Sequence, residues 1–137
     1  IDSEVWSVTS FNILRKDGME IENKNIKNPS TKDKKSFVAQ CFSENNIPTV
    51  ASTDYMRAYA EQIRPYISSP YFTLGTDGFG RSDSREKLRE FFEVDANNIV
   101  MTAAYALLKN ESLDKKDIQK IYRETNANKN KNAPWNE

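Results

Sequence analysis

Short β-rich segments alternate with helical patterns along this chain, and this alternation limits the possible folds more than any other feature. Three such segments lie at residues 5–9, 48–51 and 71–74, and each leads into a helical pattern. Strands that alternate with helices in this way pair in parallel through right-handed crossovers. The alternation therefore predicts an α/β fold with a largely parallel sheet that is covered by helices.

Residues that cap helices mark where the first predicted helices begin. Ser10 is a suitable N-cap for a helix that starts at Phe11 and that we expect to stop at Gly18. Residues 19–35 are rich in Asn and Lys and are interrupted by Pro29, so we expect an exposed connection there. The face of the next helix is expected to consist of Phe37, Val38, Cys41 and Phe42.

The segment after the second β-rich stretch also has a helical pattern. Ser52 or Thr53 is the expected N-cap, and Pro65 is expected to end the helix. Apolar residues follow at helical spacing, which predicts one buried face. Its inward face is expected to consist of Tyr55, Met56, Tyr59, Ala60 and Ile63.

Three further helices are predicted from acidic caps. Asp83 with Glu86 resembles a capping box, in which each side chain bonds the backbone of the other residue. Asp95 and Asp114 are the expected N-caps of the last two helices. The apolar stripes that follow these caps predict that all three helices pack against the sheet or against one another.

Composition excludes several classes of function. Lys and Arg number 20 against 20 Asp and Glu, and this balance gives no support to a nucleic-acid or membrane partner. The chain contains no histidine, which removes Ser-His and Cys-His nucleophile pairs and imidazole metal ligands. Cys41 is the lone cysteine, which fits a reducing, cytoplasmic location. We therefore expect no catalytic residue and no metal ligand in this chain.

The length of 137 residues suits one domain. We expect that domain to span residues 1–125 and to be followed by a partly ordered tail at 126–137. The chain opens at Ile1 with neither an initiator Met nor a signal segment, so we expect it to be a piece of a longer protein.

The loop from Gly75 to Asp83 is the segment whose composition most needs an explanation. Its three glycines permit positive φ and close approach of backbone, so its N–H groups could bind an anion such as phosphate. However, it matches neither the dinucleotide nor the Walker pattern, and Asp77 and Asp83 would repel an anion. The alternative is a rigid turn in which Arg81 or Arg85 pairs with a carboxylate, and we favour it.

Several runs of residues resemble one enzyme family, the homodimeric bacterial pyruvate dehydrogenases that form the decarboxylating first component of the pyruvate dehydrogenase complex. The similarity is to the C-terminal domain of these enzymes and covers nearly the whole chain in the same order. It is most specific over the thirteen residues from Leu74 to Glu86. A looser similarity extends to transketolase C-terminal domains. The runs are Val5 to Phe11, Ala51 to Met56, Leu74 to Glu86 and Phe92 to Asp95.

The resemblance implies a three-layer α/β fold of the transketolase C-terminal type. Its sheet would be mostly parallel and five-stranded, with one antiparallel strand and helices on both faces. In the family, thiamine diphosphate and Mg²⁺ lie between the other two domains, so the resemblance implies no cofactor in this piece. Thr76-Asp77-Gly78 with Asn97-Asn98 imitates the family's metal-binding motif, but Thr76 replaces its first glycine and the spacing is too short.

The resemblance also implies partners and a role. The full-length enzyme would decarboxylate pyruvate and reductively acetylate the lipoyl group of dihydrolipoyl acetyltransferase, and it would act as a homodimer. The piece itself would be structural and inactive. The candidate interface with a neighbouring domain or subunit consists of Asp77, Gly78, Phe79, Gly80, Arg81, Ser82, Asp83 and Arg85. The alternative role is a docking module for the subunit-binding domain of the acyltransferase, and a free-standing anion-binding domain is a third role.

Overall fold

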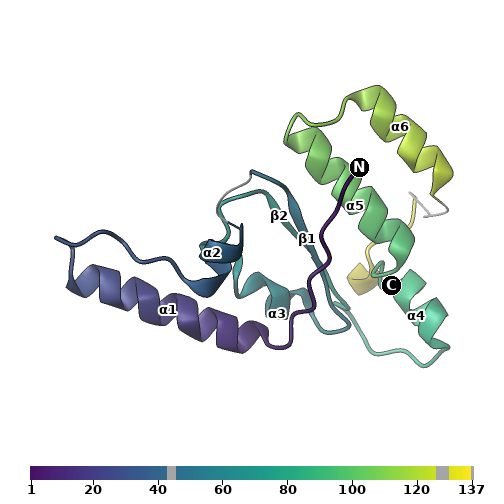
Figure 1. Cartoon of the computed structure of the whole chain (residues 1–137). Helices are drawn as coiled ribbons and strands as arrows, with labels where there is room; N and C mark the ends of the chain where they lie inside the picture. The colour runs from purple at the N-terminus through teal and green to yellow at the C-terminus, as the bar shows by residue number, and fades with distance from the viewer. Residues whose placement is uncertain (43–45, 126–129, 137) are drawn as a thin grey trace.

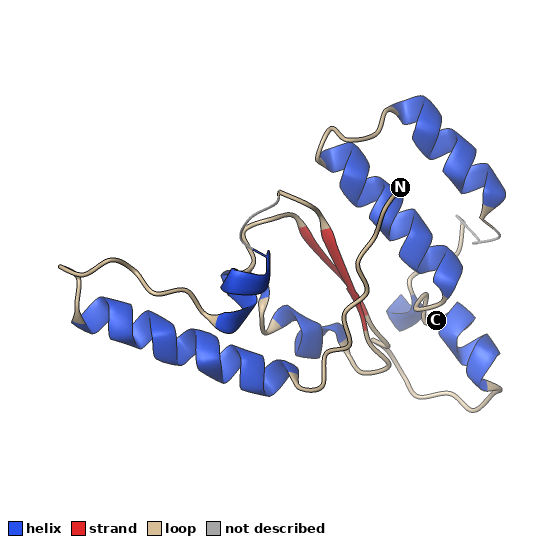
Figure 2. Ribbon diagram, in the orientation of Figure 1, coloured by secondary structure: helices blue, strands red, loops and turns tan. Residues whose placement is uncertain are grey.

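The computed structural model describes residues 1–42, 46–125 and 130–136. Strands β1 (Thr49–Ser52) and β2 (Tyr71–Leu74) form a two-stranded parallel sheet. Figure 1 shows this sheet between two groups of helices, and Figure 2 shows that the regular structure is mostly helical. The helices are α1 (Phe11–Lys27), α2 (Phe37–Phe42), α3 (Arg57–Glu61), α4 (Arg85–Phe91), α5 (Ala96–Lys109) and α6 (Lys115–Glu124), and 3₁₀ turns occur at Arg64–Tyr66 and Pro134–Asn136.

Alternate side chains of the strands point to opposite faces of the sheet, and each face has its own buried cluster. Tyr71 packs with Ala51 on the face that α1, α2 and α3 cover, which we name the α3 face. Leu74 packs with Val50 on the opposite face, which we name the α5 face. There the ring of Phe72 meets the ring of Tyr105 from α5 at 5.8 Å. The structure therefore has helices on both faces of the sheet.

The α/β class and the parallel pairing of two predicted strands are confirmed. Strand β2 occupies the predicted residues 71–74, and β1 is shifted by one residue toward the C-terminus from the predicted range 48–51. The five-stranded sheet with one antiparallel strand is not found, because the described residues hold only β1 and β2. A strand needs a hydrogen-bonded neighbour, so local β propensity by itself could not decide how many strands form.

The predicted strand at residues 5–9 is wrong for this structure. These residues form neither helix nor strand, and each of them is exposed. Val5 is 96% exposed, while the ring of Trp6 lies 5.6 Å from that of Phe42 at the end of α2. The segment thus touches the body through an aromatic contact and has no ladder of backbone hydrogen bonds.

Helix α1 does not stop at Gly18 as expected, but runs on to Lys27. Its predicted cap is confirmed, because the Ser10 side chain accepts a hydrogen bond from the backbone N–H of Ile13. Gly18 is buried, and a Cβ added there would lie 2.2 Å from the ring of Tyr66. The glycine therefore makes room for an aromatic ring inside a continuing helix, so the expectation of an exposed connection from residue 19 is also wrong.

The predictions for the next two helices are right about their existence but not about their faces. In α2, Val38 is buried whereas Phe37 is 58% exposed. Helix α3 begins at Arg57 rather than after Ser52, and its N-cap Met56 makes no side-chain cap. Of the residues expected on its inward face, Ala60 and Ile63 are buried, whereas Tyr55, Met56 and Tyr59 are exposed.

Two of the three acidic caps are confirmed. Asp95 accepts from the Asn98 N–H, and Asp114 forms a capping box with Asp117. At α4 the cap is Ser84, whose side chain accepts from Lys87 N–H, so the predicted capping box of Asp83 with Glu86 is wrong. No helix within the described ranges is long and apolar enough to cross a membrane.

The division into a domain at residues 1–125 and a tail at 126–137 stays a prediction. Residues 126–129 and 137 lie outside the described part of the chain. Pro134, in the last 3₁₀ turn, is buried, so this part of the tail packs against the body.

Candidate functional site

The loop from Gly75 to Asp83 leaves the carboxyl end of β2 and is fastened to the segment that follows β1. The backbone N–H of Thr76 donates to the carbonyl oxygen of Tyr55 at 2.9 Å, and the Thr76 hydroxyl donates to the Asp54 carbonyl oxygen at 2.9 Å. A Cβ at Gly75 would lie 2.6 Å from the backbone nitrogen of Arg57. Gly75 is therefore required by the close approach of two backbone segments.

The middle of the loop lies against the C-terminal segment. Gly78 has a φ of 122°, a backbone conformation that residues with a side chain rarely adopt. A Cβ there would also lie 3.2 Å from the carbonyl oxygen of Pro134 and 3.4 Å from the Cα of Trp135. The tail thus packs directly on the backbone of the candidate loop.

Arg57 joins the loop to the tail. Its Nε lies 3.3 Å from an Asp77 carboxylate oxygen, and its guanidinium carbon lies 5.2 Å from the centre of the Trp135 ring. This Nε is buried and makes no hydrogen bond among the described residues, so the nearby carboxylate is what compensates its charge. Asp77 is consequently engaged within the chain.

The ring of Phe91 is the second anchor of the loop. The guanidinium carbon of Arg81 lies 4.0 Å from the ring centre, and Nζ of Lys131 lies 4.6 Å from it. Lys131 Nζ also donates to the carbonyl oxygens of Glu90, at 3.1 Å, and Phe91. Both cations approach an electron-rich ring, and Lys131 also adds hydrogen bonds to carbonyl oxygens at the C-terminal end of α4.

Asp54 interacts with the two remaining arginines near the loop, Arg85 and Arg89. Its carboxylate accepts from Arg89 Nη2 at 3.1 Å, and it lies 3.8 Å from Arg85 Nη2. Asp83 accepts from the backbone N–H of Ser84 at 2.7 Å. The prediction that an arginine of this region pairs with a carboxylate is therefore confirmed for Arg85, with Asp54 as its partner.

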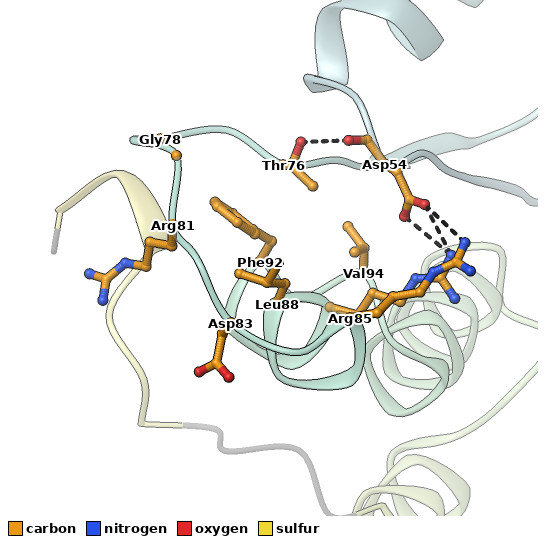
Figure 3. Close-up of a pocket in the computed structure, with 11 residues that line it drawn as sticks. Asp54, Thr76, Gly78, Arg81, Asp83, Arg85, Leu88, Phe92 and Val94 are labelled. Atoms are coloured by element: carbon orange, nitrogen blue, oxygen red, sulfur yellow. Dashed lines mark hydrogen bonds and ion pairs between the residues drawn. The ribbon is translucent and has the colours of Figure 1, made fainter.

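An open pocket of about 470 Å³ lies between the loop and α4. Figure 3 shows its apolar side chains in the middle and the arginines and Asp54 around them. Three arginines and two aspartates belong to its lining. Arg85 and Arg89 pair with Asp54, and Arg81 lies over the ring of Phe91. Its apolar lining consists of Leu88, Phe92 and Val94, and its charged lining of Asp54, Asp83, Arg81, Arg85 and Arg89.

The structure gathers only part of the predicted interface at this pocket. Five of the predicted residues line it, while Phe79 is 82% exposed and Ser82 is exposed as well. Asp77 does not line the pocket and pairs with Arg57 instead. The five pocket residues are Gly78, Gly80, Arg81, Asp83 and Arg85.

Sequence reasoning missed the residues that fasten the loop. Asp54 and Arg89 are 35 positions apart, and Trp135 lies far beyond Arg57 in the chain, so no local spacing links them. One signal was available: Trp135, beside Pro134, is the single aromatic residue after Thr125, and a lone tryptophan in a polar tail often packs on the body.

The site combines apolar side chains with paired charges. Within residues 1–42, 46–125 and 130–136, no group of three or more Cys, Asp and Glu side chains is placed to hold a metal ion. Asn98, which belongs to the sequence that imitates a metal motif, bonds to the Asp95 carboxylate at the start of α5. Neither Asp77 nor Asn98 is therefore free to bind a cation.

Comparison with known proteins gives a consistent result. Residues 1–95 match the family model described as a transketolase-like TK C-terminal domain. The pyruvate dehydrogenase E1 component of Pseudomonas aeruginosa is 50% identical over 119 residues, which cover 86% of this chain and 14% of that protein. The E1 component of Escherichia coli K12 is 44% identical over 135 residues, which cover 98% of this chain and 15% of that protein. The E1 component of Cupriavidus necator is 40% identical over 134 residues, which likewise cover 98% and 15%.

The chain thus spans about one-seventh of the length of these relatives, 14% of one and 15% of the other two. The resemblance identified from its motifs is confirmed by these matches. The remaining six-sevenths of each relative has no counterpart in this chain.

Proposed function

The chain belongs to the family of transketolase-like C-terminal domains, and from this membership we propose that it is part of a pyruvate dehydrogenase E1 component. The observation that carries the proposal is 44% identity to one such component over 98% of the chain. In this proposal the full-length protein decarboxylates pyruvate and reductively acetylates the lipoyl group of an acyltransferase. It acts as a homodimer in the cytoplasm.

Thiamine diphosphate and Mg²⁺ belong to the rest of the proposed enzyme. When bound there, the cofactor supplies the carbanion stabilisation that decarboxylation of a 2-oxo acid needs. In the described part of this chain no group of Cys, Asp and Glu side chains is placed to hold a metal ion, so these residues do not fit a Mg²⁺ site. We infer that this part of the protein is structural and inactive by itself.

The loop from Asp77 to Asp83, with Arg85, is proposed to support a neighbouring domain or subunit. The proposal is supported by contacts that hold the loop in place. Gly75 packs on the backbone of Arg57, and Arg81 packs on the ring of Phe91. A surface that is already ordered loses little conformational entropy when another surface packs on it.

The five-stranded sheet belongs to the same proposal. Both β1 and β2 have one partner in the described chain, which leaves one edge of each strand without a strand beside it. Open edges are normally covered in folded proteins. We propose that the rest of the longer polypeptide completes the sheet.

The direct test is an assay of the full-length protein with pyruvate, thiamine diphosphate, Mg²⁺ and a lipoylated acceptor. We expect turnover by the full-length protein and none by this chain alone. Turnover of another 2-oxo acid but not of pyruvate would contradict the proposed substrate. Turnover by the chain alone would contradict its structural role.

The supporting role of the loop is tested by Arg81→Ala in the full-length protein. We expect weaker subunit association and reduced turnover, measured by sedimentation and by the same assay. Arg123→Ala, which removes an exposed arginine on α6, is the matched control. Wild-type association and turnover in the Arg81 variant would exclude the role. A heat signal when the chain is titrated with the subunit-binding domain of the acyltransferase would favour docking instead.

A further inference from the structure

Large apolar side chains are exposed around the candidate loop. Three of them lie at the start of α3, one in the loop and one in the tail. Their exposed fractions run from 46% for Tyr59 to 82% for Phe79. We name this set the aromatic patch, and it consists of Tyr55, Met56, Tyr59, Phe79 and Trp135.

Contacts within the chain bring together the three segments that carry the aromatic patch. The rings of Tyr55 and Tyr59 are 5.2 Å apart. The Tyr55 carbonyl oxygen accepts from the loop at Thr76, and Trp135 covers the Arg57 guanidinium beside it. Gly78, the neighbour of Phe79, lies against the backbone of Trp135. Three segments that are distant in sequence thus meet at one surface.

The charged groups next to the aromatic patch are engaged within the chain. Arg57 lies beside Asp77, and Arg81 lies over Phe91. A partner that covers the patch would therefore have few unpaired charges to desolvate. Tyr, Trp, Phe and Met are the residue types enriched where protein surfaces pack together, and a cluster of them that stays exposed indicates an interaction site.

We propose that the aromatic patch is the surface on which the rest of the same longer polypeptide packs, with Phe79 as its central anchor. This inference rests on the proposed function and identifies the contact surface of the same loop. The relatives have about six-sevenths of their length outside the region that this chain matches, so a covering segment is available in the same molecule. Such a segment binds at the high effective concentration of a tethered partner. The occupant is an apolar surface, because the exposed members of the patch are Tyr, Met, Phe and Trp side chains and the neighbouring charges of Arg57 and Asp77 pair with each other.

Methionine oxidation in the wild-type full-length protein tests the proposal without any substitution. Met56 in the patch is 52% exposed in this structure, and Met19 on α1 is 47% exposed, so the two form a matched pair. Hydrogen peroxide oxidises methionine according to its exposure. We expect Met56 to react at least about tenfold more slowly than Met19 in the folded protein and at the same rate in denaturant. Rates within threefold of each other in the folded protein would overturn the proposal.

The identity of the occupant is tested by dilution. Protection of Met56 that persists when the protein is diluted below its subunit dissociation constant supports a segment of the same chain. Protection that disappears on dilution would mean that a second subunit covers the patch, and this would overturn the proposed occupant.

A pair of serine variants tests the anchor. Phe79→Ser in the full-length protein is expected to lower the thermal midpoint by several degrees and to remove the protection of Met56. Ile26→Ser, at a residue of α1 that is 71% exposed, is the control and should change neither. Unchanged Met56 protection in the Phe79 variant would overturn the role of Phe79. None of these measurements requires turnover, so loss of the proposed pyruvate activity and failure of the contact can be told apart.

Discussion

The two faces of the sheet are buried in different ways. On the α3 face, the buried hydroxyl of Tyr71 donates to the Ala60 carbonyl oxygen at 2.8 Å. Arg64 Nη1 donates to the carbonyl oxygen of Tyr71 at 2.8 Å, and its guanidinium carbon lies 5.1 Å from the centre of that ring. On the α5 face, the buried cluster consists of the apolar side chains Leu74, Phe92 and Val94, and its edge opens into the 470 Å³ pocket.

This difference shows what each face contributes to the molecule. Buried polar groups that are fully bonded hold one arrangement, since any other would leave them unpaired. The α3 face therefore fixes α3 against β2. Apolar contacts do not depend on direction as hydrogen bonds do, so the packing of the α5 face constrains its neighbours less. The loop and the pocket lie at the edge of this α5 face, whereas three members of the aromatic patch lie at the start of α3.

The largest expected effect is on the α5 face. Phe92→Ala removes a ring that is 8% exposed, and such a change typically costs about 3–5 kcal/mol of unfolding free energy. Urea denaturation of the chain measures it. Phe79→Ala is the matched control, since Phe79 is 82% exposed and its removal from this chain should change stability by about 0.5 kcal/mol or less. Equal losses would show that the cluster around Phe92 is not the core of this face.

The next effect concerns the junction between the sheet and the loop. A Cβ in Gly75→Ala would lie 2.6 Å and 2.7 Å from backbone atoms of Arg57 and Tyr55, which cannot move aside as a side chain could. We expect a loss of about 2–3 kcal/mol, measured as a shift of the urea midpoint. Gly80→Ala, where nothing lies within 4 Å, should be nearly neutral. A neutral Gly75 variant would contradict the close approach of these segments.

A smaller effect is expected on the α3 face. Tyr71→Phe removes the buried hydroxyl that donates to the Ala60 carbonyl oxygen, which also accepts from the Ile63 N–H, and the loss should cost about 0.5–1.5 kcal/mol. Tyr59→Phe, at an exposed ring, is the control. Burial raises the pKa of Tyr71, so the unfolded chain loses this proton first as the pH rises. The difference in unfolding free energy between the wild-type chain and the Tyr71→Phe variant should therefore be complete below about pH 10 and should shrink above it.

The smallest effect is the acid sensitivity of the α3 face. Hydrogen bonding to Arg64 lowers the pKa of Glu61, although partial burial opposes the shift. A carboxyl group with a lowered pKa stabilises the fold at pH values above its pKa in the unfolded chain. This contribution is lost as the pH falls. We expect stability to decline below about pH 4.5, and Glu61→Gln to flatten that decline in thermal melts at several pH values. The same slope in both proteins would exclude Glu61 as its source.

Elements with strong local signals could be predicted from the sequence. Residues 71–74 are β-rich and bounded by Pro70 and Gly75, and they form β2 as expected. Asp95 and Asp114 cap helices because an aspartate bonds the free N–H groups of the first turn, whatever surrounds it. The family resemblance rested on such local runs and was confirmed.

The misses have tertiary causes. Gly18 lies inside helix α1 and does not end it, because its lack of a side chain leaves room for the ring of Tyr66. Residues 5–9 lack a strand partner, so their β propensity has no effect. In the candidate site, the loop was recognised from its glycines, but its contacts with Asp54, Arg57 and Trp135 were not.

What the sequence determined by itself was strand β2, the caps at Ser10, Asp95 and Asp114, and the family, because these signals lie in short runs of neighbouring residues. Only the tertiary structure decided that Arg57 and Asp77 pair, that the tail lies on Gly78 and that an aromatic patch stays exposed. These contacts join residues that are about 20 to 80 positions apart, and closing such loops depends on the packing of the whole chain rather than on any local preference.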